Sequence, residues 1–179
     1  MNSKPLTAAT VFLPLSDPEL KLLQKVYSQR ALGGDGFRGL SKTDTGNLTA
    51  LERRIAWNLA EGKSYFCRLS TRSPKDGGAK QKPKADGEAK DVKPAAVERL
   101  KARNANLRVT SAEQVTTLLT RSARVFADIT NYFESRTLGT ASGALNLILR
   151  EWLDQLPHDH EFRCYVHNKT LTAISQYHC

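Results

Sequence analysis

The hydrophobic positions of the chain follow two spacings, the alternation of a strand and the three- or four-residue interval of a helix. Residues 10–15, TVFLPL, are an apolar run that predicts a strand. The following Ser16-Asp17-Pro18 predicts a helix start, with a capping side chain and a proline in the first turn. Apolar residues then keep helical spacing up to Gly33-Gly34, where the glycines end the helix.

A glycine-rich segment separates this helix from the next one. Residues 33–46, GGDGFRGLSKTDTG, have no apolar periodicity and predict a mobile connector. They lack the spacing and the preceding strand of a phosphate-binding glycine motif. Leu48, Leu51 and Ile55 then share one face of a helix that the spacing predicts at about 47–61.

Alternation returns in residues 64–70, SYFCRLS, which predict a strand with Tyr65, Cys67 and Leu69 on one face. The composition then changes abruptly. Residues 77–106 hold eight lysines and arginines against four acidic residues, with few large apolar side chains. Such a segment cannot bury enough apolar surface to fold, so we expect a disordered basic insertion.

The strongest helical pattern begins at Thr110 or Ser111, either of which can cap it. A single long helix with one continuous apolar face is predicted from Val115, Leu118, Leu119, Ser122, Val125, Phe126, Ile129 and Phe133. Three adjacent strands should follow, one at 144–152 and two in the closing segment 161–179. Helices and strands in this order predict a mixed α/β (α+β) fold built of layers.

Charge narrows the choice of partners without selecting one. The chain has 27 Lys and Arg against 18 Asp and Glu, a net charge of +9, which favours anionic partners such as nucleotides, RNA or an acidic protein surface. No apolar stretch reaches the ~20 residues of a membrane span, and Pro14 argues against a signal peptide, so we expect a cytoplasmic protein without membrane attachment. The lysine-rich insertion has no aromatic residue for base stacking, so no specific nucleic acid is expected.

The cysteines and histidines do not form a recognisable site. Cys67, Cys164 and Cys179 are an odd number on distant apolar segments, so we expect reduced, buried thiols. Cys164 and His167 differ by three positions along a strand and therefore point to opposite faces. No paired-ligand motif or base-orienting motif accompanies them, so neither a zinc site nor a catalytic Cys–His pair is predicted.

The first of the closing strands has two chemically different faces. Phe162, Cys164 and Val166 share one face and should pack on helices, whereas Glu161 and Arg163 share the other. A charged face within a sheet needs either solvent or a polar ligand. Two interpretations remain open here. The face is either a solvated surface or an anion cleft, in which Arg163 holds phosphate oxygens and Glu161 accepts hydrogen bonds from sugar hydroxyls.

Three quoted segments, FCRLSTRSPKD, LILREW and EFRCYVHNKTLTAISQY, occur in an order that resembles the cell division cycle protein 123 family. In that family a hydrophobic strand ending in Arg-(Lys/Glu)-Trp precedes Glu-Phe-Arg-Cys and a closing Ile-Ser-Gln. The resemblance covers roughly residues 60–76 and 107–177, about half of the chain. It implies a partial ATP-grasp-type fold, in which two α/β lobes hold ATP between their sheets. It also implies an assembly chaperone that binds the gamma subunit of translation initiation factor 2.

The resemblance assigns nucleotide-binding residues one by one. Arg68 lies where the family has a lysine directed at the phosphates. Three residues lie in the loop beside it: Ser70, Ser73 and Lys75. Four residues match the hinge between the lobes, whose backbone would meet the adenine edge: Arg150, Glu151, Trp152 and Leu153. Glu161 matches a ribose-contacting carboxylate, and Arg163 beside it would face the nucleotide; no catalytic residue or metal ligand is assigned.

Two departures from the family pattern matter. Arg68 replaces the family's lysine, so a planar fork takes the place of a compact ammonium. The family's magnesium-binding residues follow the Ile-Ser-Gln segment and do not occur before Cys179, so we expect a C-terminally incomplete chain, deficient in magnesium–ATP binding. Three units are expected: 1–76 with the helices and the phosphate-side strand, 77–106 as the disordered linker, and 107–179 as a helix and the three-stranded start of the C-terminal lobe.

Three functions compete at this point. The first is an ATP-binding assembly chaperone, in which ATP and magnesium fix the angle between two lobes and so the surface offered to the initiation-factor subunit. The second is a fragment of an ATP-grasp carboxylate–amine ligase-like enzyme, for which the residues supply no acceptor chemistry. The third is a basic interaction protein that has lost nucleotide binding. The residues favour a binding protein over an enzyme.

Overall fold

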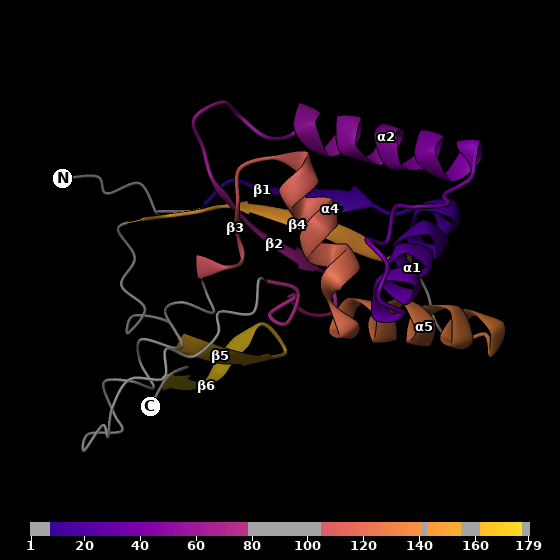
Figure 1. The fold of residues 1–179 in the computed structure, drawn as a ribbon. Helices are drawn as coiled ribbons and strands as arrows, with labels where there is room; N and C mark the ends of the chain where they lie inside the picture. The colour runs from indigo at the N-terminus through magenta and orange to yellow at the C-terminus, as the bar shows by residue number, and fades with distance from the viewer. Residues whose placement is uncertain (1–7, 79–104, 141–142, 155–161, 177–179) are drawn as a thin grey trace, which may run out of the picture.

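A four-stranded antiparallel sheet forms the centre of the fold (Figure 1). The computed structural model describes residues 8–78, 105–140, 143–154 and 162–176. The strands lie in the order β1 (Thr10–Pro14), β4 (Asn146–Glu151), β2 (Tyr65–Leu69) and β3 (Arg108–Val109). A separate two-stranded sheet contains β5 (Phe162–His167) and β6 (Thr170–Gln176).

Helices cover one face of the larger sheet and form the core with it (Figure 1). They are α1 (Asp17–Ala31), α2 (Lys42–Trp57), α4 (Ala112–Arg121) and α5 (Ala123–Thr137). Leu20, Ile55 and Leu119 are among the fully buried helix side chains in this core. The mixed α/β fold class predicted from the sequence is confirmed, as are the strands near 10–15 and 64–70.

Strand alternation gives the larger sheet two different faces. Cys67 lies opposite Leu149 and Leu69 opposite Leu147, and all four side chains are completely buried against the helices. The other face, which we call the open face, carries half-buried and exposed side chains. Its members are Phe12, Phe66, Arg68, Arg108, Ile148 and Arg150.

The long helix predicted from residue 110 onward is in fact two helices. Ser122 has extended backbone angles (φ −92°, ψ 116°), and its Oγ accepts a hydrogen bond from the Val125 amide at 3.2 Å, so it ends α4 and caps α5. The prediction of a continuous helix was wrong because serine at this position fits the apolar spacing equally well. The spacing also gives no sign of the Ser122 contact with Asp76, whose carboxylate accepts a hydrogen bond from the Ser122 hydroxyl.

The second helix also begins earlier than the apolar spacing predicted. Ser41 caps α2 by accepting a hydrogen bond from the Asp44 amide at 3.1 Å, so the helix starts at Lys42 rather than near residue 47. The connector is therefore shorter than the predicted 33–46 segment. Polar residues fill the first turn, where an apolar pattern gives no signal.

The predicted group of three adjacent strands is divided between two sheets. β4 lies between β1 and β2, whereas β5 pairs with β6 alone. The expectation that Phe162, Cys164 and Val166 pack on helices is also wrong, because all three are exposed in the structure. Of the cysteines expected to be buried, Cys67 is buried and Cys164 is exposed.

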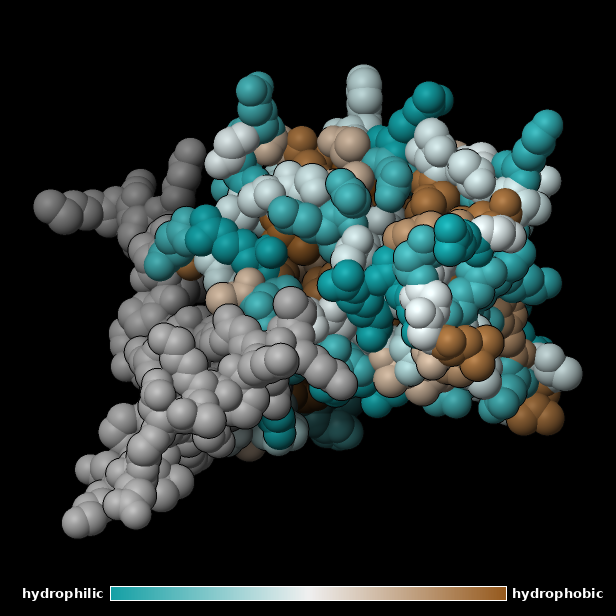
Figure 2. Space-filling model, viewed as in Figure 1, coloured by the Kyte–Doolittle hydropathy of each residue, from teal (hydrophilic) through white to brown (hydrophobic). Residues whose placement is uncertain are grey.

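Several sequence predictions fall on residues outside the described ranges. These include most of the predicted insertion, the carboxylate of Glu161 and the thiol of Cys179. The view in Figure 2 looks onto the helices, and polar residues cover most of this side, with apolar residues in small separate groups. None of the helices in the described part of the chain combines the length and the apolar character needed to cross a bilayer.

Candidate functional site

The open face brings two arginines from neighbouring strands close together. Arg68 on β2 lies opposite Ile148, and Arg150 on β4 lies opposite Phe66. Directly opposed residues have Cβ atoms about 5 Å apart, and diagonal neighbours such as Arg68 and Arg150 are roughly 7–8 Å apart. Two of the predicted site residues therefore share one surface, with apolar residues between them.

The guanidinium of Arg68 is held by the turn that follows its own strand. Its Nε donates to the Leu69 carbonyl at 2.9 Å, and its Nη2 donates to the Thr71 carbonyl at 3.0 Å. These bonds use two of the five N–H donors of a guanidinium, so donors remain for a ligand. Arg150 is exposed, and within the described ranges its side chain makes no hydrogen bond or ion pair.

A second cluster of polar and aromatic side chains lies beside Arg150. Arg108 on β3 donates to the Ser64 hydroxyl at 2.9 Å and binds both carboxylate oxygens of Asp154, at 2.7 and 3.3 Å. Its guanidinium carbon lies 5.8 Å from the centre of the Trp152 ring. Trp152 is half-buried, and its backbone amide extends the pairing of β4 with β2 through the Ser64 carbonyl at 2.8 Å. Cationic and aromatic groups thus meet where the predicted hinge begins.

The other predicted hinge residues do not share this surface. Glu151 alternates to the helix-covered side and forms an ion pair with Lys63 at 2.8 Å. The hydrogen bond that Lys63 donates to Glu151 raises the pKa of the Lys63 ammonium above its ordinary value. Leu153 is half-buried just beyond the strand. Within the hinge, the alternation of β4 therefore places the side chains of Arg150 and Glu151 on opposite faces of the sheet.

The loop of residues 70–78 follows β2 at one end of the open face. Ser70 extends the pairing with β4, because its amide donates to the Asn146 carbonyl at 2.8 Å and its hydroxyl accepts from the Asn146 amide at 3.2 Å. Ser73 accepts a backbone hydrogen bond from Lys75 at 2.9 Å, which tightens the loop. The three predicted loop residues thus lie in one short segment directly after Arg68.

Sequence reasoning missed the side chains that hold this loop against α5. Asp128, only 7% exposed, accepts hydrogen bonds from the Thr71 hydroxyl and from Arg72 Nε, both at 2.6 Å. Asp76 accepts from the Ser122 hydroxyl at 2.5 Å and from the Arg124 amide at 3.2 Å. One signal was available in the sequence, namely a carboxylate directly before the buried Ile129 of an apolar helix face.

The structure does not test the predicted acid–guanidinium pair of the closing strands. Arg163 lies on β5 opposite Ser175, and Glu161 falls outside the described ranges. Figure 1 shows the β5–β6 hairpin as a unit apart from the four-stranded sheet. A common hollow between these residues and Arg68 stays a prediction.

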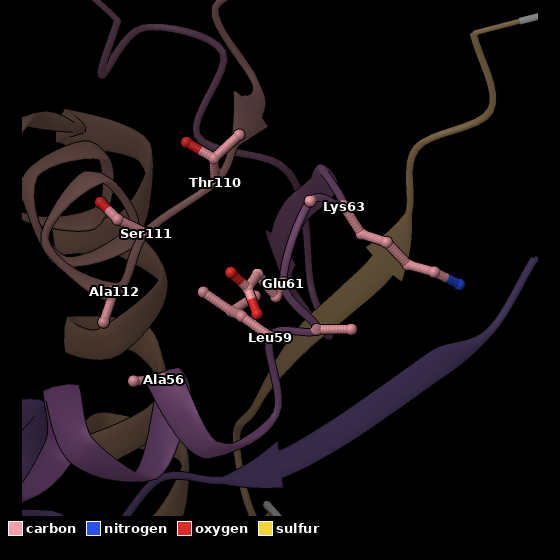
Figure 3. A pocket seen from close by; sticks show the side chains of 9 residues that line it. Ala56, Leu59, Glu61, Lys63, Thr110, Ser111 and Ala112 are labelled. Carbon is pink, nitrogen blue, oxygen red and sulfur yellow. The ribbon is translucent and has the colours of Figure 1, made fainter.

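Two hollows in the structure lie among the helices and contain none of the predicted nucleotide-binding residues. One, of about 460 Å³, lies between the end of α2 and the start of α4. Figure 3 shows Leu59 and Glu61 at its centre and the amine of Lys63 turned away from it. The other, of about 510 Å³, is lined by Arg30, Asp35 and Arg121 among others. Since neither hollow touches the open face, they do not support the nucleotide prediction.

The described residues also show whether a magnesium ion could be held here. Among them, His, Cys, Asp and Glu side chains form no group of three that could ligate a metal ion. Two acidic residues of this part of the chain, Asp154 and Asp128, are each paired with an arginine. The fit to a metal is therefore poor in this part of the chain, and phosphate charge would have to meet arginines instead.

Comparisons with known proteins bear on the fold and on the family. The D123 family model matches residues 99–179. Cdc123 from Schizosaccharomyces pombe is 21% identical with a TM-score of 0.52, over 96% of this chain and 56% of that protein. The C-terminally truncated form of the same protein gives 21% identity and a TM-score of 0.53, over 96% and 57%. No curated protein sequence matched the chain.

The chain spans little more than half the length of these solved structures. At this level of identity the structural match establishes the fold, and the family model adds a sequence signature over residues 99–179. The segment 99–179 thus carries the D123 pattern, and the described fold is similar to that of Cdc123, which confirms the family resemblance and the mixed α/β fold class drawn from the sequence.

Proposed function

We propose that the open face binds the phosphates of a nucleotide, and we propose ATP because of the family resemblance. We propose further that the chain takes part in assembling translation initiation factor 2 through the gamma subunit. The observation that supports nucleotide binding is the diagonal placement of Arg68 and Arg150 across β2 and β4. A phosphate bound on this face would be attracted by the positive charges of both arginines.

The surroundings of the two arginines suit the rest of a nucleotide. Phe66 lies directly opposite Arg150, and Trp152 offers a half-buried aromatic ring beside Arg108. Aromatic rings stack on bases, and guanidinium groups bind phosphate oxygens bidentately. The net charge of +9 adds a long-range attraction for such an anion.

The β5–β6 hairpin supplies the second wall in this proposal. Arg163, Tyr165 and His167 alternate to its polar face. ATP held between this face and the open face would set the angle between the two sheets. That angle would in turn determine the surface presented to the initiation-factor subunit, so the proposed action is conformational and includes no bond-making step.

Nucleotide binding is tested by titrating the chain with ATP in a calorimeter. Arg150→Ala should weaken ATP binding about tenfold, the effect of losing one charge-assisted hydrogen-bonding partner. Arg53→Ala is the matched control, because Arg53 is an exposed arginine on α2, outside the open face. Equal affinity of the two variants for ATP would contradict the assignment of the phosphates to this face.

Chaperone function is tested separately, by capture of the gamma subunit of translation initiation factor 2 with and without ATP. ATP-dependent capture by the unsubstituted chain, lost in Arg150→Ala and kept in Arg53→Ala, is the expected result. Release of ADP in the presence of a carboxylate and an amine would instead favour a ligase. Capture of the gamma subunit that depends neither on ATP nor on Arg150 would favour a basic interaction protein.

A further inference from the structure

Asp128 is the buried carboxylate that joins α5 to the turn after β2. It accepts hydrogen bonds from the Thr71 hydroxyl and Arg72 Nε, and Arg72 also donates to the Arg124 carbonyl at 3.4 Å, one turn earlier on α5. The hydrogen bond with Asp128 raises the pKa of the Arg72 guanidinium. The charge of Asp128 is thus paired and its two oxygens hydrogen-bonded, as burial of a carboxylate requires.

The same turn determines where Arg68 points. Thr71 accepts from Arg68 Nη2 through its carbonyl, and it donates to Asp128 through its hydroxyl. The Leu69 carbonyl accepts from Arg68 Nε, while the Leu69 amide donates to the Arg72 carbonyl at 3.1 Å and closes the turn. Thr71 therefore contacts a charged group on each side of the sheet, and its position couples Asp128 to Arg68.

We propose that Asp128 is a positioning residue that fixes the guanidinium of Arg68 through Thr71. The proposal rests on the function above, in which Arg68 meets the phosphates. With two guanidinium donors held on carbonyls, Arg68 has fewer rotamers to lose when an anion binds its remaining donors. When Asp128 no longer holds Thr71, the carbonyl that orients Arg68 is free to move, and this preorganisation is lost.

The decisive experiment is a double-mutant cycle with ATP as the probe. Asp128→Asn should weaken ATP binding roughly tenfold when Arg68 is present and less than about twofold in an Arg68→Ala background. The effects of the two substitutions on ATP affinity should not add, because Asp128 acts through Arg68. Thr71→Val, at an exposed position, removes the hydrogen bond between Thr71 and Asp128 but leaves the buried Asp128 charge paired with Arg72. This variant can therefore replace Asp128→Asn if that one does not fold. Its expected effect is a smaller loss of ATP affinity, about threefold, with the same non-additivity.

Asp17→Asn is the matched control for the cycle. Asp17 also pairs with an arginine of α5, Arg136 at 2.6 Å, but this pair is exposed and distant along the helix from Asp128. It should leave the affinity for ATP unchanged within about twofold, because an exposed pair contributes little. An equal loss of affinity in both Arg68 backgrounds would overturn the positioning role and leave Asp128 with a general structural one.

A second readout needs no nucleotide. The Nε–H of Arg68, observed by NMR after ¹⁵N-arginine labelling, should exchange slowly with solvent because it is bonded to the Leu69 carbonyl. Both Asp128→Asn and Thr71→Val should accelerate this exchange at least about tenfold, and an unchanged rate would overturn the proposal. If the unsubstituted chain bound no ATP, the proposed function would fall, and the exchange rate alone would decide whether Asp128 positions Arg68.

Discussion

Ser122 donates a 2.5 Å hydrogen bond to Asp76 at the position where α4 ends and α5 begins. Asp76 also accepts from the Arg124 amide, so a carboxylate from the loop after β2 satisfies a free N–H at the start of α5. The break between the two helices and the placement of the loop therefore depend on the same contact. This contact connects the helical layer to the segment that carries Ser73 and Lys75.

Ser122→Ala should lower the free energy of unfolding by about 1–2 kcal/mol, because it removes the cap of α5 and the partner of Asp76. The measurement is urea denaturation followed by circular dichroism. Ser28→Ala removes a hydroxyl that bonds only to a carbonyl within an exposed helix turn, so it should change stability by less than about 0.5 kcal/mol. Equal effects of the two substitutions would contradict the role given to Ser122.

Gly77→Ala should be destabilising by about 2 kcal/mol or more, because the added Cβ would lie 2.2 Å from the Leu118 carbonyl oxygen. Gly46→Ala is the matched control, since a Cβ there meets nothing within 4 Å and the residue lies within α2. That substitution should raise stability by about 0.5–1 kcal/mol through helix propensity. Opposite signs of the two changes in urea midpoint are the expected result.

Acid should remove stability through Asp44. Hydrogen bonds from Lys25 and then Ser41 lower the pKa of its carboxyl below the ordinary value of 3.8. A carboxyl whose pKa is lower in the folded state stabilises the fold above its unfolded pKa, and this contribution is lost as the pH falls through the folded pKa. The difference in urea midpoint between the unsubstituted chain and Asp44→Asn should therefore be constant from pH 7 to about pH 5. Below about pH 4 this difference should shrink toward zero.

Lys25→Met provides the control for this pH dependence. It removes the first cause of the lowered pKa while leaving the Asp44 carboxyl in place. The acid loss of stability should become shallower in this variant. If the loss of stability at acid pH were the same in Lys25→Met as in the unsubstituted chain, the Lys25–Asp44 contact of 2.6 Å would not contribute to the pH dependence.

The two described cysteines should differ sharply in reactivity. Burial raises the pKa of the Cys67 thiol to about 12, and only a thiolate reacts readily with disulfide reagents. Cys164 is exposed on β5. In a Cys179→Ser background at pH 8, mass spectrometry should show Ellman's reagent on Cys164 in the native protein and on Cys67 only after unfolding. Rapid native modification of Cys67 would contradict its placement in the core.

Much of the central sheet could be predicted from local patterns. Alternation around Cys67 identified the strand and its buried face, because one side of an antiparallel strand here meets the helices. The position of β4 between β1 and β2 could not be predicted, since pairing over such sequence distances leaves no local trace. The sequence order instead suggested that β4 joins the closing hairpin.

The candidate site likewise has features that the sequence could predict and features that it could not. The resemblance identified Arg68 and Arg150, and register then placed them on one face. It did not identify Thr71 or Asp128, whose roles exist only as a contact between residues 57 positions apart. Glu151 shows another limit of motif reading, because a motif groups neighbouring residues while strand alternation turns their side chains to opposite faces.

The central claim, that the open face binds nucleotide, is tested most directly with tryptophan fluorescence. The chain has two tryptophans, so Trp57→Phe leaves Trp152, beside Arg108, as the sole reporter. ATP should change the emission of Trp152 saturably, with about tenfold weaker binding in Arg150→Ala and unchanged binding in Arg53→Ala. An emission of Trp152 that stays constant while calorimetry records ATP binding, or a titration unaffected by Arg150→Ala, would contradict the claim.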